Sequence, residues 1–189
     1  MKKLDIFVVI LSGALFIGTP DIFKSGDWKF WGYWAAQISQ FAFLISLLPG
    51  IYRRLEMFKR GKSLYVFLRK YRRTVGIVAY ITGVLHFYWS YILPNPGQFF
   101  PSLISDWMGF VGLFLLTPLF LTSNDFSLNH LGLFWKKLHL LVHLAIWLLL
   151  MHVVIKGRFL TSLITGGVLI IDIISWILVA LRDSVKSTK

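Results

Sequence analysis

Three histidines lie within one strongly apolar stretch of the chain, WKKLHLLVHLAIWLLLMHVV, at residues 135–154. They are His139, His143 and His152, and a fourth, His86, ends another apolar stretch. Neutral imidazole is a common ligand of haem iron, and two imidazoles on one iron suit electron transfer. Polar side chains inside a membrane are costly, face protein or water, and are candidate functional residues. The four residues therefore predict either a haem site or hydrogen-bonded packing.

The elements that would hold these histidines are apolar helices. The chain has 189 residues, of which 57% are hydrophobic and 15% charged, and its mean hydropathy is +0.70. About 20 apolar helical residues cross a bilayer, so each long apolar run counts as one expected span. The runs are too uniformly apolar for barrel strands. We expect an all-α integral membrane protein with a six-transmembrane helix bundle, its spans at about 4–19, 31–51, 74–93, 107–123, 138–155 and 160–181.

Positive charge is distributed unevenly between the two ends of these spans. Sixteen of the 20 Lys and Arg residues fall in the segments that would share one face, and four fall on the other: Lys24, Lys29, Lys156 and Arg158. The excess marks the cytoplasmic face, so both termini are expected in the cytoplasm. The basic loop at 53–73 either sets this topology and attracts anionic lipid, or docks an acidic electron donor. This placement argues against nucleic acid as a partner.

The same topology places two histidines at one depth. His86 lies 12 residues beyond the expected helix start at Thr74, which is about 18 Å along the helix. His152 lies 13 residues beyond His139, about 20 Å along a helix of the same direction. The alternatives are that His86 and His152 share one iron atom, or that each only hydrogen-bonds a neighbour.

Other side chains narrow the kind of cofactor. The chain has no cysteine, so a haem would be held noncovalently. Arg72 and Arg73 lie near the depth of His139 and either pair with a haem propionate or help to set topology.

Three segments carry a resemblance to a known family. They are RRTVGIVAYITGVLH at 72–86, FLTSND at 120–125 and LGLFWKKLHLLVHLAIWLLLMH at 131–152. In these segments the chain resembles the ferric-reductase-like transmembrane domain family, and within it the MsrQ (YedZ) type of haem-binding membrane subunit. The resemblance implies that residues 1–189 form a single domain of this kind.

The resemblance implies a b-type haem protein of the bacterial inner membrane that passes electrons to the periplasmic side. The family's helix-3 histidine corresponds to His86, and its two helix-5 histidines correspond to His139 and His152. One haem b is expected at the outer level, and a second, inner haem would use His139 with a partner that the sequence does not identify. The implied acceptor is the catalytic subunit of a periplasmic methionine-sulfoxide reductase.

His143 departs from the family, which usually has an aromatic residue at this position. It lies one turn beyond His139, and either replaces it as a ligand or only packs. In an ideal helix His139 and His152 would lie about 140° apart around the axis. Either this helix is locally irregular, or the two residues approach their cofactors from different sides.

The chain shows no Gly-x-Gly-x-x-Gly motif, so it is not expected to draw electrons from NAD(P)H by itself. The expected donors are a cytosolic flavin reductase, a bound flavin such as FMN, or a membrane quinol. The chain is thus interpreted as an electron-transfer subunit rather than a complete enzyme.

Two other kinds of function remain open: the same helices with a different electron acceptor, such as ferric ion, or a cofactor-free transporter or scaffold. Asp172, near the middle of the last apolar run, either transfers protons at a quinol site or hydrogen-bonds a Ser, Thr or His. Gln37 and Gln40 are expected to hydrogen-bond between helices.

Overall fold

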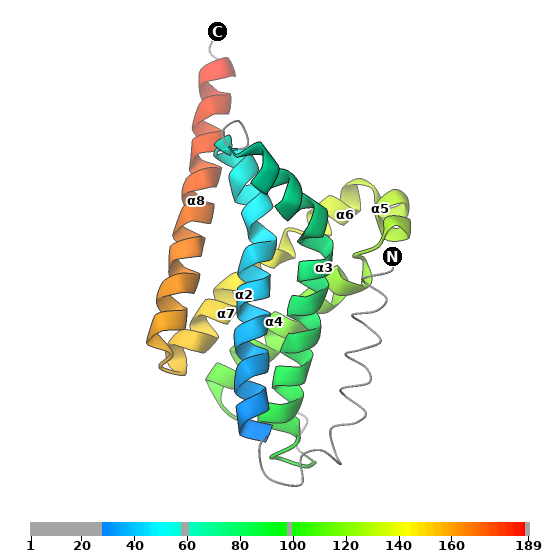
Figure 1. Cartoon of the computed structure of the whole chain (residues 1–189), viewed down its shortest axis with the longest axis vertical. Coiled ribbons are helices and arrows are strands. Elements are labelled where there is room, and N and C mark those ends of the chain that lie inside the picture. The colour runs from blue at the N-terminus through cyan, green and yellow to red at the C-terminus, as the bar shows by residue number, and fades with distance from the viewer. Residues whose placement is uncertain (1–27, 58–60, 98–99, 188–189) are drawn as a thin grey trace.

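The computed structural model describes residues 28–57, 61–97 and 100–187, and Figure 1 shows a bundle of helices. The first predicted span, at 4–19, lies outside the described residues. The helices are α2 (Trp28–Arg54), α3 (Lys62–Phe87), the π-helix η2 (Tyr88–Ile92), α4 (Ile104–Leu121), α5 (Asp125–Leu131), α6 (Leu133–Leu138), α7 (Leu141–Ile155) and α8 (Phe159–Ser187).

Five helical stretches in the described part of the chain are long and apolar enough to cross a membrane. They are Trp28–Arg54, Lys62–Ile92, Ile104–Leu121, Leu133–Ile155 and Phe159–Val185. They correspond to the last five predicted spans, so the protein is a multi-pass membrane protein whose described residues form helices and connecting turns but no strand. The count of six and the side on which each terminus lies remain predictions.

Two of these helices are longer than the hydropathy pattern predicts. Helix α3 begins at Lys62, well before the expected start near 74, and α8 continues to Ser187. The segment 62–73 is rich in Leu, Lys and Arg and contains no Gly or Pro. These residues favour helix whether or not the segment lies in lipid, so the helix continues where the apolar run stops.

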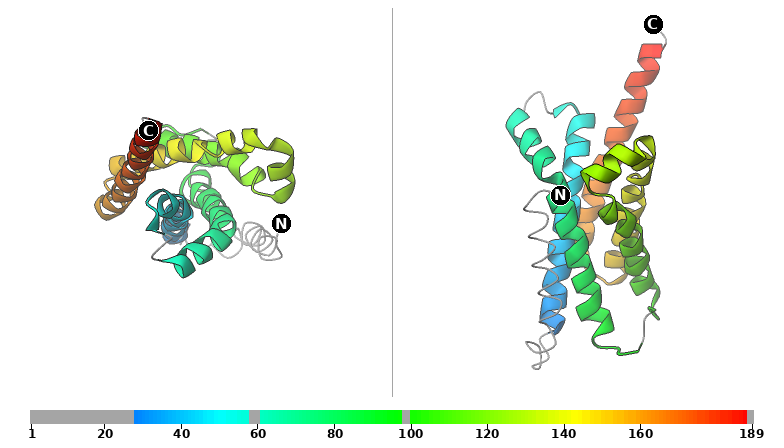
Figure 2. Two further views of the ribbon diagram at one scale, coloured as in Figure 1. Left: turned by 90° about the horizontal axis from the view of Figure 1, so that it is seen from above. Right: turned by 90° about the vertical axis from the view of Figure 1, so that its right-hand side faces the viewer.

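The helices pack as two close pairs with a fifth helix beside them. Helix α2 lies along α3, α4 lies along α7, and α8 contacts both α2 and α7. Figure 2 shows these helices from two further directions. The main buried cluster draws on α2, α3, α7 and α8 and consists of Ala42, Phe43, Leu44, Leu47, Ile51, Ala79, Ala145, Ile146 and Leu169.

Large apolar side chains also cover much of the outer surface. Phe114 of α4 is 67% exposed and Leu163 of α8 is 56% exposed. An outward apolar surface of this kind is what a helix bundle presents to lipid.

Polar side chains within the bundle bond across helix boundaries. Ser39 Oγ of α2 donates to the carbonyl of Ala79 on α3 over 2.7 Å. The Gln40 amide of α2 donates to the carbonyl of Thr161 and to the hydroxyl of Thr165, both on α8. Such bonds satisfy polar groups that lipid cannot satisfy, so the interhelical role predicted for Gln40 is confirmed.

The bond between Gln40 and Thr165 yields a stability prediction. Thr165 is fully buried, so Thr165→Val keeps the side-chain shape but leaves the Gln40 amide with one acceptor fewer. We expect a loss of about 0.6–1.7 kcal/mol in the free energy of unfolding in detergent micelles. Thr161→Val is the control, because the Thr161 hydroxyl bonds only the Arg158 carbonyl of its own turn. Equal losses in the two variants would contradict the assignment.

Candidate functional site

The structure brings His86 of α3 and His152 of α7 together. Their ring centroids are 6.4 Å apart and the ring planes make an angle of 70°. Both side chains are partly buried. The prediction that His86 and His152 lie at one depth is therefore confirmed, and their two rings lie close together.

The His86 ring is oriented by the neighbouring helix α2. Its Nδ1 lies 2.9 Å from the carbonyl oxygen of Gly32 and 3.1 Å from Ser90 Oγ. Since a carbonyl only accepts, Nδ1 carries the proton and Nε2 keeps its lone pair. A Cβ on residue 32 would collide with Ser90 Oγ, so glycine allows this approach. The chain then widens into the π-helix η2, a feature common at functional sites.

The His152 ring is oriented by residues at the start of α4. Its Nδ1 donates to the carbonyl oxygen of Ser105 over 2.6 Å, which again leaves Nε2 unprotonated. A Cβ on Gly109 would lie 3.0 Å from His152 Nδ1, so α4 packs directly against the ring. An ion pair of 2.6 Å between Asp106 and Lys156 holds the same helix ends together.

The separation of the two ring centroids is compatible with both imidazoles binding one metal ion. Imidazole–metal bonds of about 2 Å imply ring centroids roughly 6 Å apart, close to the 6.4 Å observed. Metal-binding histidines also donate their second nitrogen to a carbonyl or carboxylate, as both rings do here. In the described residues no group of three or more His, Cys, Asp or Glu could hold a metal ion. Two imidazoles alone suit an iron whose remaining ligands come from a porphyrin, so these residues fit a haem.

His139 lies apart from this pair, at a break between α6 and α7. The helix stops at Leu138 and resumes at Leu141, so the local irregularity considered for this segment is present. His139 Nδ1 bonds the carbonyl of Trp135 at 3.0 Å, and the two rings stack with centroids 3.8 Å apart. The structure therefore does not bring His139 to His86 and His152, and its role as an inner ligand stays a prediction.

Arg72 and Arg73 differ in their surroundings. Arg73 pairs with Asp125 of α5 at 2.5 Å. Arg72 is exposed and lies within electrostatic range of His139. Of the two, Arg72 has the freer guanidinium for an anionic group beside His139.

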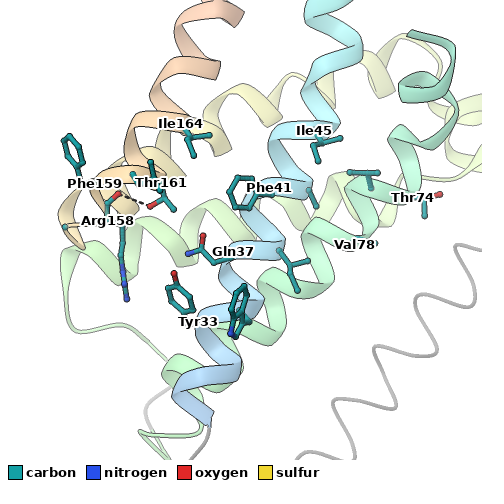
Figure 3. Close-up of a pocket in the computed structure, with 16 residues that line it drawn as sticks. Tyr33, Gln37, Phe41, Ile45, Thr74, Val78, Arg158, Phe159, Thr161 and Ile164 are labelled. Carbon is teal, nitrogen blue, oxygen red and sulfur yellow. Dashed lines mark hydrogen bonds between the residues drawn. The ribbon is translucent and has the colours of Figure 1, made fainter. Parts of the chain in front are cut away.

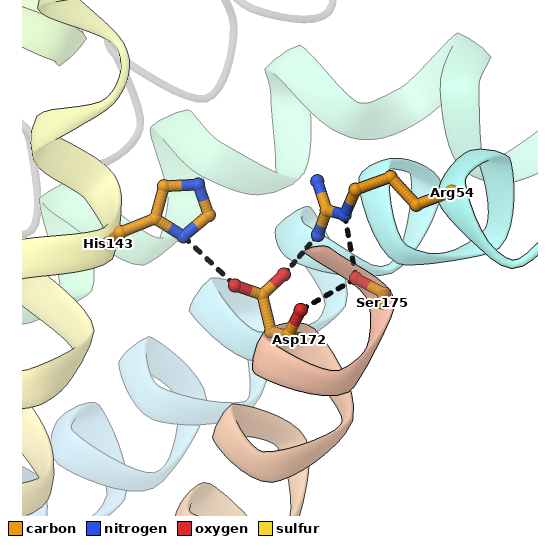
Figure 4. Close-up of polar contacts among 4 residues, drawn as sticks. All are labelled: Arg54, His143, Asp172 and Ser175. Carbon is orange, nitrogen blue, oxygen red and sulfur yellow. Dashed lines mark hydrogen bonds and ion pairs between the residues drawn. The ribbon is translucent and has the colours of Figure 1, made fainter. Parts of the chain in front are cut away.

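His143 and Asp172 meet in a buried polar network with Arg54, shown in Figure 4. The Arg54 guanidinium of α2 pairs with one Asp172 oxygen, and His143 Nδ1 of α7 lies 3.0 Å from the other. Arg54 Nε donates to Ser175 Oγ over 2.7 Å, and its guanidinium lies 4.5 Å from the Trp176 ring centroid. The side chains of Arg54 and Asp172 are 10% and 6% exposed.

This network bears on the alternatives predicted for Asp172 and His143. Asp172 is ion-paired and accepts from a histidine, as the hydrogen-bonding alternative predicts. His143 is held by Asp172 and lies against Trp176, with ring centroids 6.1 Å apart. The contacts thus favour a structural role for His143 over replacement of His139.

Several residues of the site could not be predicted from the sequence pattern. Gly32 and Ser105 act through backbone carbonyls, which every residue has, and Arg54 reads as one more residue of a basic loop. Gly109 could have been predicted, because Ser105 and Gly109 lie four residues apart in α4 and small residues at that spacing mark close helix contacts.

Fold and site together define a multi-pass helical membrane protein in which two imidazoles from different helices lie close together. Curated relatives from Brucella ovis, Brucella canis and Brucella suis bear the name "Protein-methionine-sulfoxide reductase heme-binding subunit MsrQ", and each is 37% identical over 86 residues. The match covers 42% of this chain and 39% of each relative, so the chain spans about two fifths of their length. The predicted resemblance to the MsrQ type is therefore confirmed over that part of the chain.

The other comparisons identify no further relative. No family model matches the chain. No solved structure matches it significantly.

The buried network yields a second stability prediction. Asp172→Leu would leave the Arg54 charge inside the bundle without a counterion, at a cost of about 3–5 kcal/mol in unfolding free energy. The double variant Arg54→Met/Asp172→Leu removes both charges and should recover much of that loss. Thermal or denaturant unfolding in micelles measures both, with Asp183→Leu as a control because Asp183 is exposed on the same helix. A double variant less stable than Asp172→Leu would contradict the prediction.

Proposed function

We propose that the protein binds one haem b through His86 and His152 as axial ligands. The observation that carries the proposal is the 6.4 Å separation of two rings whose Nδ1 atoms are both committed to carbonyls of other helices. The name of the MsrQ relatives supports haem as the cofactor. When bound, a haem with two imidazole ligands supplies one-electron chemistry at iron.

The residues around the pair would hold and shield such a group. The Gly32 and Ser105 carbonyls fix the tautomer and direction of the two rings, and a hydrogen bond to Nδ1–H raises the basicity of the ligand. Leu85 and Trp89, on the same stretch of chain as His86, are each 5% exposed and belong to a buried apolar cluster with Ala35. Burial and hydrogen bonds of this kind tune the reduction potential of a haem.

A second, inner haem would lie near His139. In this proposal His139 supplies one ligand, as the resemblance implies, and Arg72 supplies an anion-binding group for a propionate. Arg73 is partly committed to Asp125 and would contribute less.

The proposed role is that of a membrane subunit that conducts electrons. By analogy with the relatives' name, the proposed acceptor is the catalytic subunit of a methionine-sulfoxide reductase. Its position on the periplasmic side of the bacterial inner membrane is proposed from the resemblance. The proposed donor is a cytosolic flavin reductase, a bound FMN, or a membrane quinol. The chain would supply the path, and its partners would supply the substrate chemistry.

The distribution of charge along the bundle supports this orientation. In Figure 1 the end of α2, the start of α3, helix α6 and the end of α8 lie toward the upper side, and these segments carry most of the Lys and Arg. The starts of α2 and α8 lie toward the lower side. The positive-inside rule makes the upper side cytoplasmic.

The orientation is testable because the chain contains no cysteine. Ser63 and Ser102 are both exposed, at opposite ends of the bundle. In spheroplasts we expect a membrane-impermeant maleimide to label Ser102→Cys, and to label Ser63→Cys only after permeabilisation. The opposite pattern would invert the topology and the direction of electron flow.

Haem ligation is testable by spectroscopy of the purified full chain. We expect a Soret band and a reduced b-type α band, both lost in His86→Ala and in His152→Ala, with haem occupancy at least roughly tenfold lower because each variant removes one bond to iron. His130→Ala is the matched control, because His130 is exposed and bonds only the Phe126 carbonyl of its own turn. A colourless wild-type protein, or full occupancy in both ligand variants, would refute the proposal.

A further inference from the structure

A groove of about 870 Å³ runs along α2 between α3 and the start of α8. Its walls include Tyr33, Gln37 and Phe41 of α2, Val78 of α3, and Arg158 and Ile164 beside or within α8 (Figure 3). Volumes of roughly 300–1,000 Å³ are typical of sites for small molecules. None of the four candidate haem histidines lines this groove.

Polar groups gather at the end of the groove where α2 and α8 begin. The Arg158 guanidinium lies 5.3 Å from the Tyr33 ring centroid, and Gln37 points into the same space (Figure 3). The described residues provide no hydrogen-bond partner for the Gln37 amide, so the interhelical bond predicted for Gln37 is not found there. An amide in an apolar groove is stable only with a partner, which a bound molecule would supply.

Among the described residues, no carboxylate pairs with the Arg158 guanidinium. Arg54, Arg73, Lys156 and Arg182 each pair with an acidic side chain. Arg158 has only the Tyr33 ring near it among the described contacts. A guanidinium at the mouth of an apolar groove is complementary to an anionic head group, and above all to phosphate.

Toward the middle of the bundle the groove becomes apolar. Phe41, Ile45 and Ile164 line it and are 44%, 42% and 37% exposed. The polar end lies near the helix starts and the apolar end near mid-membrane depth. A phospholipid in that leaflet has the same arrangement, with its polar head group at the polar end of the groove and its acyl chains at the apolar end.

We propose that this groove binds a phospholipid of the leaflet at the α2 and α8 starts. Its phosphate pairs with Arg158, a glycerol ester oxygen accepts from the Gln37 amide, and one acyl chain lies along Phe41, Ile45 and Ile164. The bound lipid joins α2 to α8 at the end of the bundle opposite the Arg54–Asp172 pair. This inference does not rest on the haem proposal.

Native mass spectrometry of the delipidated full chain tests the proposal. The probes are dioleoyl-phosphatidylglycerol and dioleoylglycerol, which share acyl chains but differ in the phosphate head group. We expect the phospholipid to bind at least tenfold more tightly, a difference of about 1.4 kcal/mol. Arg158→Gln should remove most of that difference, and Arg158→Lys should restore part of it. Lys29→Gln removes an exposed cation of α2 and should have no effect.

A second variant tests the groove itself. Ile45→Trp fills the apolar end and should weaken binding of both probes without changing the charge of the mouth. Equal affinities for the two probes would overturn the proposal, and so would equal effects of Arg158→Gln and Lys29→Gln on binding. Preferential retention of a neutral isoprenoid by the purified protein would also overturn it. Absorption spectra of the same variants keep the two proposals separate, because loss of the phospholipid site should leave the haem bands unchanged.

Discussion

The arrangement of the bundle depends on two hydrogen bonds from imidazole to backbone carbonyl. Lipid offers no partner to an imidazole N–H, so each buried ring must find an acceptor within the protein. His86 finds the Gly32 carbonyl on α2, and His152 finds the Ser105 carbonyl at the start of α4. Each bond spans a closely packed helix pair, and each sets one ring's tautomer and direction. The two ring centroids lie 6.4 Å apart with both helix pairs held in this way.

Close packing makes those bonds possible. Gly32 and Gly109 let a neighbouring helix approach where a side chain would interfere with Ser90 or His152. Between the pairs, the hydroxyls of Tyr80 on α3 and Thr117 on α4 lie 3.1 Å apart. Small residues and single polar bonds are the usual means of helix association in lipid, where apolar contact alone gives little preference between partners. The separation of the two imidazoles is thus a result of backbone packing as much as of histidine position.

Hydropathy and spacing predicted the five stretches in the described residues that could cross a membrane and the common depth of His86 and His152, because both follow from helix rise and bilayer thickness. They left a local irregularity of the His139 helix as one of two alternatives, because the chain contains no Gly or Pro at the break, and they did not predict the partner of Asp172. Arg54 lies 118 residues from Asp172 and looks like one of many topology-setting cations. Carbonyl acceptors also cannot be predicted from the sequence, since the residue types at positions 32 and 105 do not indicate where the backbone carbonyls point.

Hydrogen bonding at Nδ1 does not by itself distinguish a ligand from a packing residue. His130 and His139 bond the carbonyl four residues earlier in their own helices, a contact open to any helical histidine. His143 bonds a carboxylate that Arg54 already neutralises, which stabilises the join of α2, α7 and α8. Only His86 and His152 both take their acceptors from other helices and lie within 6.4 Å of each other. These two bonds fix the orientations of both rings across two helix pairs. That constraint on the ring orientations favours a shared metal centre over packing.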